Sequence, residues 1–142
     1  MGEHRLQLPE WWPPIEGHRW LCDKIGLIPT LHLQVLTHRV NNEIVGAVGY
    51  DNWTGSCCDV HWAGSGWTPR FLAAAFYYPF VVENCKIMIA RVPSGNIESA
   101  HLMGRLGFQR IVSICDGHPD GYMHIFMIRK ENCKLLKRYY NA

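Results

Sequence analysis

Hydrophobic and polar residues follow a helical period near the start of the chain and a strand period after it. Residues 11–28 begin with two tryptophans and two prolines and continue with apolar residues at helical spacing, which predicts an amphipathic helix. Its buried side would carry Ile15, Trp20, Leu21 and Ile25. The chain then changes to short segments of alternating or continuous apolar residues separated by turn residues.

These short segments predict six strands, three before and three after the middle of the chain. The predicted strands are residues 31–40, 43–51, 57–63, 85–93, 109–115 and 121–130. The first two would form a hairpin around Asn41 and Asn42, and the last two would be joined by a turn over 116–121. The fourth is strongly apolar, as is typical of a strand at the centre of a sheet.

Two further helices are predicted between these strands. The first begins at Thr68, a residue type that caps helix N-termini, has Pro69 at its first position, and should be kinked or ended by Pro79. The second follows Asn96 and ends at Gly107, which suits a left-handed C-cap. Its apolar side would consist of Ile97, Ala100, Met103 and Leu106.

The order of the elements is helix, three strands, helix, strand, helix and two strands. This order predicts a mixed α/β sheet rather than a sandwich or a helical bundle. A length of 142 residues is sufficient for one domain with its own buried core, so we expect residues 1–142 to form a single domain.

Charge and hydropathy limit the partners. The net charge is +2 and the basic residues are scattered, which provides no nucleic-acid face. The apolar runs are too short for a transmembrane helix, and the first residues lack the apolar core of a signal peptide. We therefore expect a cytoplasmic protein with reduced cysteines that binds neither nucleic acid nor a membrane.

Cysteine and histidine lie close together at two places, but neither has the spacing of a closed zinc site. Cys57, Cys58 and His61 form one group, and Cys115 and His118 form the other. In a strand, Cys57 and Cys58 would point to opposite faces and could not easily share a metal. We expect no metal, and interpret these cysteines as small buried residues.

The segment HWAGSGWTPR, residues 61–70, places Gly64 and Gly66 directly before a predicted helix start. Glycine allows backbone to approach a ligand closely, and the N–H groups at a helix N-terminus point toward one place, which suits a phosphate. An ordinary turn into a helix is the alternative interpretation of this pattern.

Residues 96–111, NIESAHLMGRLGFQRI, resemble the second half of the GCN5-related N-acetyltransferase (GNAT) family. The pyrophosphate loop of that family is written Q/R-x-x-G-x-G/A, and residues 61–66 fit it with His61 at the Gln or Arg position. The likeness covers residues 41–137, and this segment resembles GNAT-like proteins of tailed phages and prophages. Residues 1–40 are divergent and carry no match.

The resemblance implies a mostly antiparallel sheet with one splayed parallel strand pair, and acetyl-CoA as co-substrate. Backbone N–H groups of the glycine loop would hold the pyrophosphate, Arg70 would contact a CoA phosphate, and Asn96 would bond the pantetheine arm. The implied cofactor-binding residues are Ala63, Gly64, Ser65, Gly66, Trp67, Arg70 and Asn96. A solvated charge at Arg70 and a helix cap at Asn96 are the alternatives. Tryptophan at Gly64 or Gly66 should abolish CoA binding and leave the fold intact.

Acetyl transfer to an amine needs a group that accepts the amine proton. Strand alternation places Cys57, Asp59 and His61 on one face of the third strand. Asp59 is the first candidate for this catalytic base, and His61 is the second because an imidazole titrates near neutral pH. A structural role is the alternative for both.

The resemblance also implies a tyrosine, seven residues after the motif Asn, that protonates the departing thiolate. Met103 occupies that position and cannot donate a proton. Tyr122, His101 or a water could substitute. Asp116, His118 and Asp120 lie in the last hairpin, which often borders the acceptor site in the family, although turn roles explain them as well.

Two functions therefore remain open. One is an N-acetyltransferase, an acyltransferase that moves the acetyl group of acetyl-CoA to an amine of a protein or small molecule. The other is a GNAT-fold protein without catalysis, acting as a phage virion component or binding a host protein. The glycine loop and Asn96 favour the enzyme. The missing tyrosine and the aromatic residues Trp11, Trp12 and Trp20 favour a binding role. The partner in that role could also be a second copy of the chain, which would form a homo-oligomer.

Overall fold

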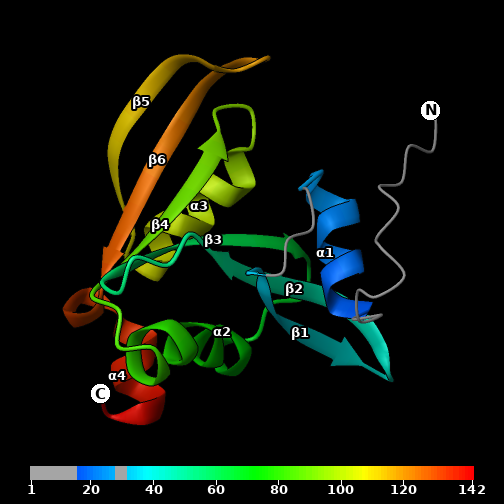
Figure 1. Ribbon diagram of the computed structural model, residues 1–142, viewed down its shortest axis with the longest axis vertical. Coiled ribbons are helices and arrows are strands. Elements are labelled where there is room, and N and C mark those ends of the chain that lie inside the picture. The colour runs from blue at the N-terminus through cyan, green and yellow to red at the C-terminus, as the bar shows by residue number, and fades with distance from the viewer. Residues whose placement is uncertain (1–15, 28–31) are drawn as a thin grey trace.

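The computed structural model describes residues 16–27 and 32–142, which form a six-stranded sheet with helices on both faces (Figure 1). The strands are β1 (Gln34–Val40), β2 (Glu43–Asp51), β3 (Cys57–Gly64), β4 (Ile87–Pro93), β5 (Gln109–His118) and β6 (Gly121–Arg129). The helices are α1 (Glu16–Ile25), α2 (Pro69–Tyr77), α3 (Ile97–Leu106) and α4 (Lys134–Tyr140), with a short π-helix at Tyr78–Val82 and a 3₁₀ turn at Lys130–Asn132. The predicted mixed α/β class is confirmed.

Across the sheet the strands lie in the order β1-β2-β3-β4-β6-β5, and every neighbouring pair is antiparallel except β3 and β4. The parallel pairing runs only from Cys57 opposite Ile87 to Val60 opposite Ala90. Both strands continue beyond these residues, β3 to Gly64 and β4 to Pro93. The two strands therefore separate, and the predicted splayed parallel pair is confirmed.

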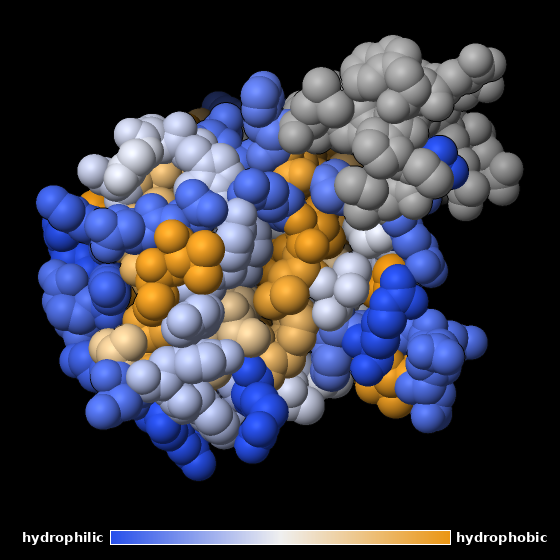
Figure 2. All heavy atoms as spheres, turned by 60° about the horizontal axis from the view of Figure 1, so that its bottom comes forward, coloured by the Kyte–Doolittle hydropathy of each residue, from blue (hydrophilic) through white to orange (hydrophobic). Residues whose placement is uncertain are grey.

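Helices α2, α3 and α4 cover one face of the sheet and enclose the main core. Phe76 of α2, Met103 of α3 and Leu136 of α4 are almost fully buried there, and each such side chain contributes about 1.5–3 kcal/mol through burial. The buried Tyr50 hydroxyl donates to the carbonyl of Ala75 at 2.5 Å and ties β2 to α2. The end of the molecule that carries α2 and α4, brought forward in Figure 2, shows hydrophobic side chains within a largely hydrophilic margin.

Helix α1 lies on the opposite face, against β1, β2 and β3 (Figure 1). The approach is close: a Cβ on Gly17 would stand 2.6 Å from Thr37 Cγ2, and a Cβ on Gly49 would stand 2.5 Å from Leu21 Cδ2. Glycines on the helix and on the strand therefore allow α1 to lie against the sheet.

The buried stripe predicted for α1 was only partly right. Leu21 is fully buried, but Trp20 is half-buried and Ile25 is 37% exposed. The side that faces the sheet contains Gly17, His18, Leu21 and Cys22. Close contact through glycine turned the helix away from its most apolar side, which a count of apolar positions does not reveal. Ile15 and residues 11–15 and 28 of the predicted helix lie outside the described residues.

Helix α2 begins and ends as predicted. The Thr68 hydroxyl accepts a hydrogen bond from the Phe71 N–H at 3.1 Å, and Pro69 occupies the first position. The α-helix ends at Tyr77, immediately before the π-helix that contains Pro79. The predicted C-cap of α3 is also confirmed, because Gly107 adopts φ +104°.

Strand boundaries differ from the prediction by more than one residue at three places. β1 begins at Gln34 and β4 at Ile87 rather than at residues 31 and 85. β5 reaches His118 inside the predicted turn, because a bulge with Asp116 at φ +60° lets the ladder resume with His118 opposite Gly121. The second strand, 43–51, has the predicted bounds.

Among the described residues, no helix is both long and apolar enough to span a membrane. The six cysteines are all free thiols. Cys115 is exposed, Cys57 is half-buried, and the other four are buried. Burial raises the pKa of the Cys57, Cys85 and Cys58 thiols and raises the pKa of Cys133 to about 11.

We expect one thiol, that of Cys115, to react rapidly with a chromogenic disulfide reagent in the native protein at neutral pH. The other five thiols are buried or half-buried, and burial raises the pKa of each of them, so they have less access and less thiolate character. The Cys115→Ser variant should lose the rapid phase and keep the total thiol titre of the unfolded protein less one. A rapid phase that survives this substitution would contradict the burial of the others.

Candidate functional site

The point where β3 and β4 separate is bordered by polar side chains. His61 and Arg91 are the first residues of their strands beyond the last paired positions, Val60 and Ala90. Because Val60 points into the core beneath α2 and α3, the neighbouring Asp59 and His61 point to the opposite face, where α1 lies. The structure thus brings Asp59 and His61 together on one face.

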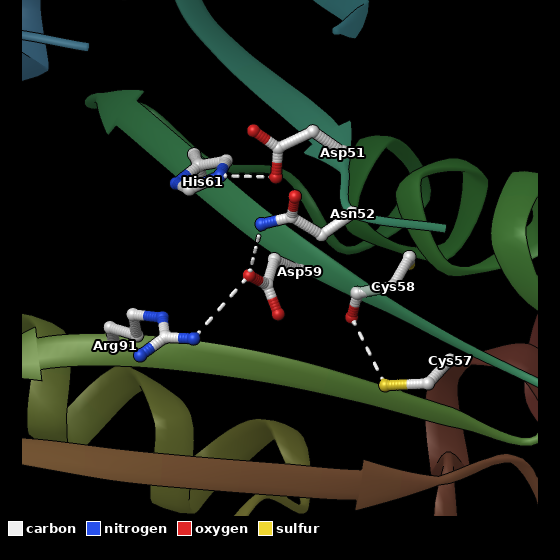
Figure 3. A network of polar contacts seen from close by, with 7 residues as sticks. All are labelled: Asp51, Asn52, Cys57, Cys58, Asp59, His61 and Arg91. Carbon is white, nitrogen blue, oxygen red and sulfur yellow. Dashed lines mark hydrogen bonds and ion pairs between the residues drawn. The ribbon is translucent and has the colours of Figure 1, made fainter. Parts of the chain in front are cut away.

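His61 is held by Asp51, a residue at the end of β2 that the sequence did not single out. His61 Nε2 lies 2.8 Å from Asp51 Oδ1, and the side chains are only 20% and 16% exposed. With its proton on Nε2, the ring donates to the carboxylate, and its other nitrogen points away from Asp51 (Figure 3). This arrangement fixes the orientation of the ring and balances its charge when the second nitrogen takes a proton.

Asp59 is buried and engaged with two partners. Its Oδ2 accepts a hydrogen bond from Asn52 Nδ2 at 2.8 Å and lies 3.6 Å from an Arg91 guanidinium nitrogen (Figure 3). Arg91 is 56% exposed on β4, whereas Asp59 lies on β3. The ion pair therefore crosses from one strand of the splayed pair to the other, close to where they separate.

Asp51, Asn52 and Arg91 were missed by the sequence reasoning. The signal for the first was present: Asp51 ends the predicted second strand and Asp59 lies near the start of the predicted third strand, and the two stand opposite each other in the β2–β3 ladder. Asn52 follows directly at φ +52°. Arg91 could be found only from the register of the parallel pair, which joins segments far apart in the sequence.

The glycine loop leaves β3 at a position where only glycine fits. Gly64 has φ +120°, and a Cβ there would stand 2.3 Å from the carbonyl oxygen of Val45. The expectation that tryptophan at Gly64 leaves the fold intact is therefore wrong, because backbone of the neighbouring strand occupies the space. The next N–H, of Ser65, donates to the same carbonyl at 3.1 Å and is not available to a ligand.

The rest of the loop is open. Gly66 has φ +68°, and nothing lies within 4 Å of a Cβ built on it. Within the described part of the chain, the N–H groups of Gly66 and Trp67 have no backbone acceptor. The Trp67 ring covers Gly46 and stacks on Phe71 at 5.7 Å between centroids. Ala63 lies in the β2–β3 ladder, and Arg70 is exposed in the first turn of α2.

An open pocket of about 360 Å³ adjoins this loop, between the start of α2, the second half of α3 and α4. Its lining residues are Trp67, Pro69, Leu72, Leu102, Arg105, Leu106 and Leu135. The walls are apolar except for the cationic Arg105. The sequence placed Leu106 on the apolar side of its helix, but could not show that α2 and α4 lie beside it.

Asn96 caps α3. Its Oδ1 accepts a hydrogen bond from the Ser99 N–H at 3.2 Å, and its own N–H donates to the carbonyl of Pro93. The helix-capping interpretation therefore describes its side-chain oxygen. The side-chain NH₂ group is a separate donor that the cap does not use.

The side chains considered as proton donors, Tyr122 and His101, come from other elements than His61. Met103 is fully buried in the core. Tyr122 lies four residues along β6 from Phe126, the partner of Ala90, which is about 13 Å of strand. His101 is exposed on α3. His118 accepts a hydrogen bond from the Asp120 N–H within the β5–β6 turn, so these two residues stabilise the turn.

No family model matches the chain, and no curated protein matches its sequence. Solved structures do match its fold. A structure of mutant forms of the spermidine/spermine N-acetyltransferase SpeG from Vibrio cholerae aligns with a TM-score of 0.65 at 14% identity, over 76% of this chain and 72% of that one. The N-acetyltransferase PseH from Campylobacter jejuni, in complex with acetyl coenzyme A, aligns with a TM-score of 0.57 at 12% identity, over 71% and 70%.

A third structure, an acetyltransferase of the GNAT family from Bacillus anthracis, aligns with a TM-score of 0.55 at 19% identity, over 63% of this chain and 61% of that one. These neighbours are acetyltransferases, and the chain has the GNAT fold. The GNAT fold that the resemblance in the sequence implied is confirmed.

The two loop glycines should differ sharply in their contribution to stability. Gly64→Ala should lower the free energy of unfolding by about 2–4 kcal/mol, because a left-handed φ and a backbone clash act together. Gly66→Ala has an unfavourable φ but no clash, and should lower the free energy of unfolding by about 1 kcal/mol. Urea denaturation measures both, and equal losses would contradict the assigned packing of Gly64 on Val45.

Proposed function

We propose that the chain is an N-acetyltransferase that moves an acetyl group from acetyl-CoA to an amine of a protein or small molecule. The observation that carries this proposal is the splayed β3–β4 pair. The Asp51–His61 pair lies beside the opening, and the Gly66 loop with the start of α2 follows at the end of β3. A carbonyl substrate placed between the strands would meet a base and an anion site together.

The residues of the loop fit the phosphates of a coenzyme A thioester. The N–H groups of Gly66 and Trp67 and the N-terminus of α2 provide donors for an anion, which gains about 0.3–2 kcal/mol at such a position. Arg70 in the first turn and Arg105 in the pocket add positive charge on either side. The binding of acetyl coenzyme A by PseH supports this assignment.

The thioester supplies an acyl group with a thiolate leaving group, and the chain must supply proton transfer. We assign the base to His61, which accepts the amine proton at the ring nitrogen that faces away from Asp51. Asp59 was the first candidate from the sequence, but Asn52 and Arg91 already engage its oxygen. In this proposal Asp59 is a positioning residue that holds Arg91 beside the opening.

A GNAT-fold protein without catalysis is the second candidate, and burial of Met103 favours it. The side chain at the family's tyrosine position is a fully buried thioether, which cannot donate a proton to a leaving thiolate. Catalysis would then need water as the proton donor. Such a protein would bind a partner, for example as a component of a phage particle. Turnover, rather than cofactor binding, separates the two candidates.

Substitution of His61 should abolish most of the turnover. We expect His61→Ala to lower kcat by about 10²–10⁴-fold, and Asp51→Asn to lower it less, because the ring remains but loses its charged partner.

The matched control is His118→Ala, which changes a turn histidine and should leave kcat unaltered. Asp59→Ala should lower kcat/KM more than His118→Ala does. Acetylated amine and free CoA are measured by chromatography with a panel of amines. If His118→Ala were the more damaging variant, the base would belong to the last hairpin.

Acetyl-CoA binding is tested by titration calorimetry on the reduced protein. The wild type should bind, and Gly66→Trp should weaken binding at least about ten-fold by filling the open side of the loop. Gly66→Asn is the matched control, because asparagine tolerates the left-handed φ and leaves more space. Binding that Gly66→Trp does not change would remove the loop from the cofactor site, and binding without turnover on any amine would favour the second candidate.

A further inference from the structure

The half of the sheet formed by β4, β6 and β5 has an accessible apolar face on the side of α1. Phe126 of β6 points into the core, so the neighbouring Ile125 points to the opposite face. Within the described residues, the helix on that face is α1, and it packs on β1, β2 and β3 (Figure 1). Ile125 is half-buried, and Val112 opposite it on β5 is 48% exposed. Apolar side chains that remain accessible on a sheet can bind an apolar group.

The strand register places Arg91 between this apolar surface and the β3–β4 opening. Arg91 of β4 stands opposite Ile125 of β6, and Ile125 stands opposite Val112 of β5. Residues that stand opposite each other in a ladder lie on the same face of the sheet. On the other side of Arg91, β3 carries His61, the residue that follows the last parallel pair. One row across the sheet therefore runs from His61 through Arg91 to Ile125 and Val112.

The Arg91 guanidinium is held in place but keeps its donors free. One of its nitrogens lies 3.6 Å from Asp59 Oδ2, which is beyond hydrogen-bond distance. Within the described part of the chain Arg91 donates no side-chain hydrogen bond, and the side chain is 56% exposed. A guanidinium has five N–H donors in a planar arrangement that matches a carboxylate. Arg91 is therefore able to bind a carboxylate while Asp59 orients it.

The two sides of the opening carry opposite charges. Asp51 holds the His61 ring, and with that ring neutral the pair carries one negative charge. Arg91 supplies a positive charge from the facing strand, and Figure 3 shows Arg91 and His61 both further toward the strand ends than Asp59. An ammonium group is stabilised on the first side and a carboxylate on the second. A substrate with both groups fits this opening better than a diamine, whose second cation would lie beside Arg91.

We propose that the acceptor is a free α-amino acid with an apolar side chain, an inference that rests on the proposed function. Its ammonium group lies beside His61, its carboxylate binds Arg91, and its side chain lies over Ile125 and Val112. A peptide N-terminus has no carboxylate beside its amine and would leave Arg91 without this partner.

The transfer step balances with the groups named. The ammonium loses one proton to His61, and the amine lone pair then bonds to the acetyl carbon as the C–S bond of acetyl-CoA breaks. The nitrogen releases a second proton to water, water protonates the leaving thiolate, and His61 returns its proton to the solvent. The products are the N-acetylamino acid, CoA and one proton.

Four related acceptors test the assignment in steady-state turnover. L-leucine carries all the groups, L-leucinamide and 3-methylbutylamine lack the carboxylate, and glycine lacks the apolar side chain. We expect kcat/KM for L-leucine to exceed each of the other values at least about ten-fold. Turnover that is equal or faster without the carboxylate would overturn this proposal and leave the acetyltransferase activity standing.

Arg91→Gln tests the carboxylate site. It should lower the ratio of kcat/KM for L-leucine to that for 3-methylbutylamine at least about ten-fold, because only the first substrate has a carboxylate. Arg129→Gln is the matched control, since Arg129 is exposed on the same face but stands opposite Ile87, about 13 Å along the strand. This control should keep the wild-type ratio. Equal changes in the two variants would remove Arg91 from the acceptor site.

Val112→Ser tests the apolar surface. It should lower the ratio of kcat/KM for L-leucine to that for glycine about three-fold or more. Ile111→Ser provides the comparison, because Ile111 is 55% exposed on the same strand but lies in a bulge without a ladder partner. If both variants kept the wild-type ratio, the side chain of the acceptor would not lie over Val112.

A binding measurement separates failure of this proposal from failure of the proposed function. L-leucine is titrated into the full chain by calorimetry, with and without CoA, which needs no turnover. The wild type should bind, and Arg91→Gln should raise the dissociation constant at least about ten-fold while Arg129→Gln does not; thermal melts check that each variant is folded. Binding without turnover of any amine would support the amino-acid site and remove the proposed function. A wild type that does not bind L-leucine would overturn the assigned acceptor, whether or not other amines are acetylated.

Discussion

The candidate site exists because β3 and β4 pair over a short length and are then held apart by their other neighbours. β3 pairs with β2 from Asp59 to the end of the strand, where Gly64 stands opposite Gly46. β4 follows β6 as far as Pro93 opposite Met123. The sheet is thus two antiparallel halves joined by a few parallel pairs, and sheet twist carries the halves apart beyond the join. The chemistry proposed for the chain depends on this short parallel pairing, from Cys57 and Ile87 to Val60 and Ala90, and on the opening beyond it.

One face of β3 carries buried core residues and the other carries polar residues, as the alternation of side chains along a strand requires. Cys58 and Val60 point into the core under α2 and α3, whereas Asp59 and His61 point toward the side of α1. A polar group can be retained in a sheet this well packed only with partners, and Asp51, Asn52 and Arg91 supply them. The same strand therefore serves stability with one set of residues and the candidate site with the other.

Local signals in the sequence predicted local structure well. Thr68 and Pro69 located the start of α2, Gly107 located the end of α3, and alternation gave the bounds of β2, because each depends on neighbouring residues alone. Features that depend on register were not accessible. Gly17 allows its side of α1 to face the sheet, because a larger residue there would collide with the Thr37 side chain on β1.

The candidate site divides in the same way. Asp59 and His61 were found because two residues of one strand share a face, and the glycine loop was found because it precedes a helix start. Arg91 and the pocket residue Arg105 were not found, because each acquires its role from an element distant in the chain. The burial of Asp59 by Asn52 likewise requires the turn that brings β2 back onto β3.

The two loop glycines carry different kinds of information about descent. Gly64 is required by the packing of β3 on β2, so any descendant that keeps this sheet must keep it, whatever it binds. Gly66 faces open space, and the fold alone would accept asparagine there with little strain. In a comparison of related chains, we therefore expect a glycine at the position of Gly64 wherever the sheet is kept. A glycine at the position of Gly66 would instead indicate that ligand binding is still under selection.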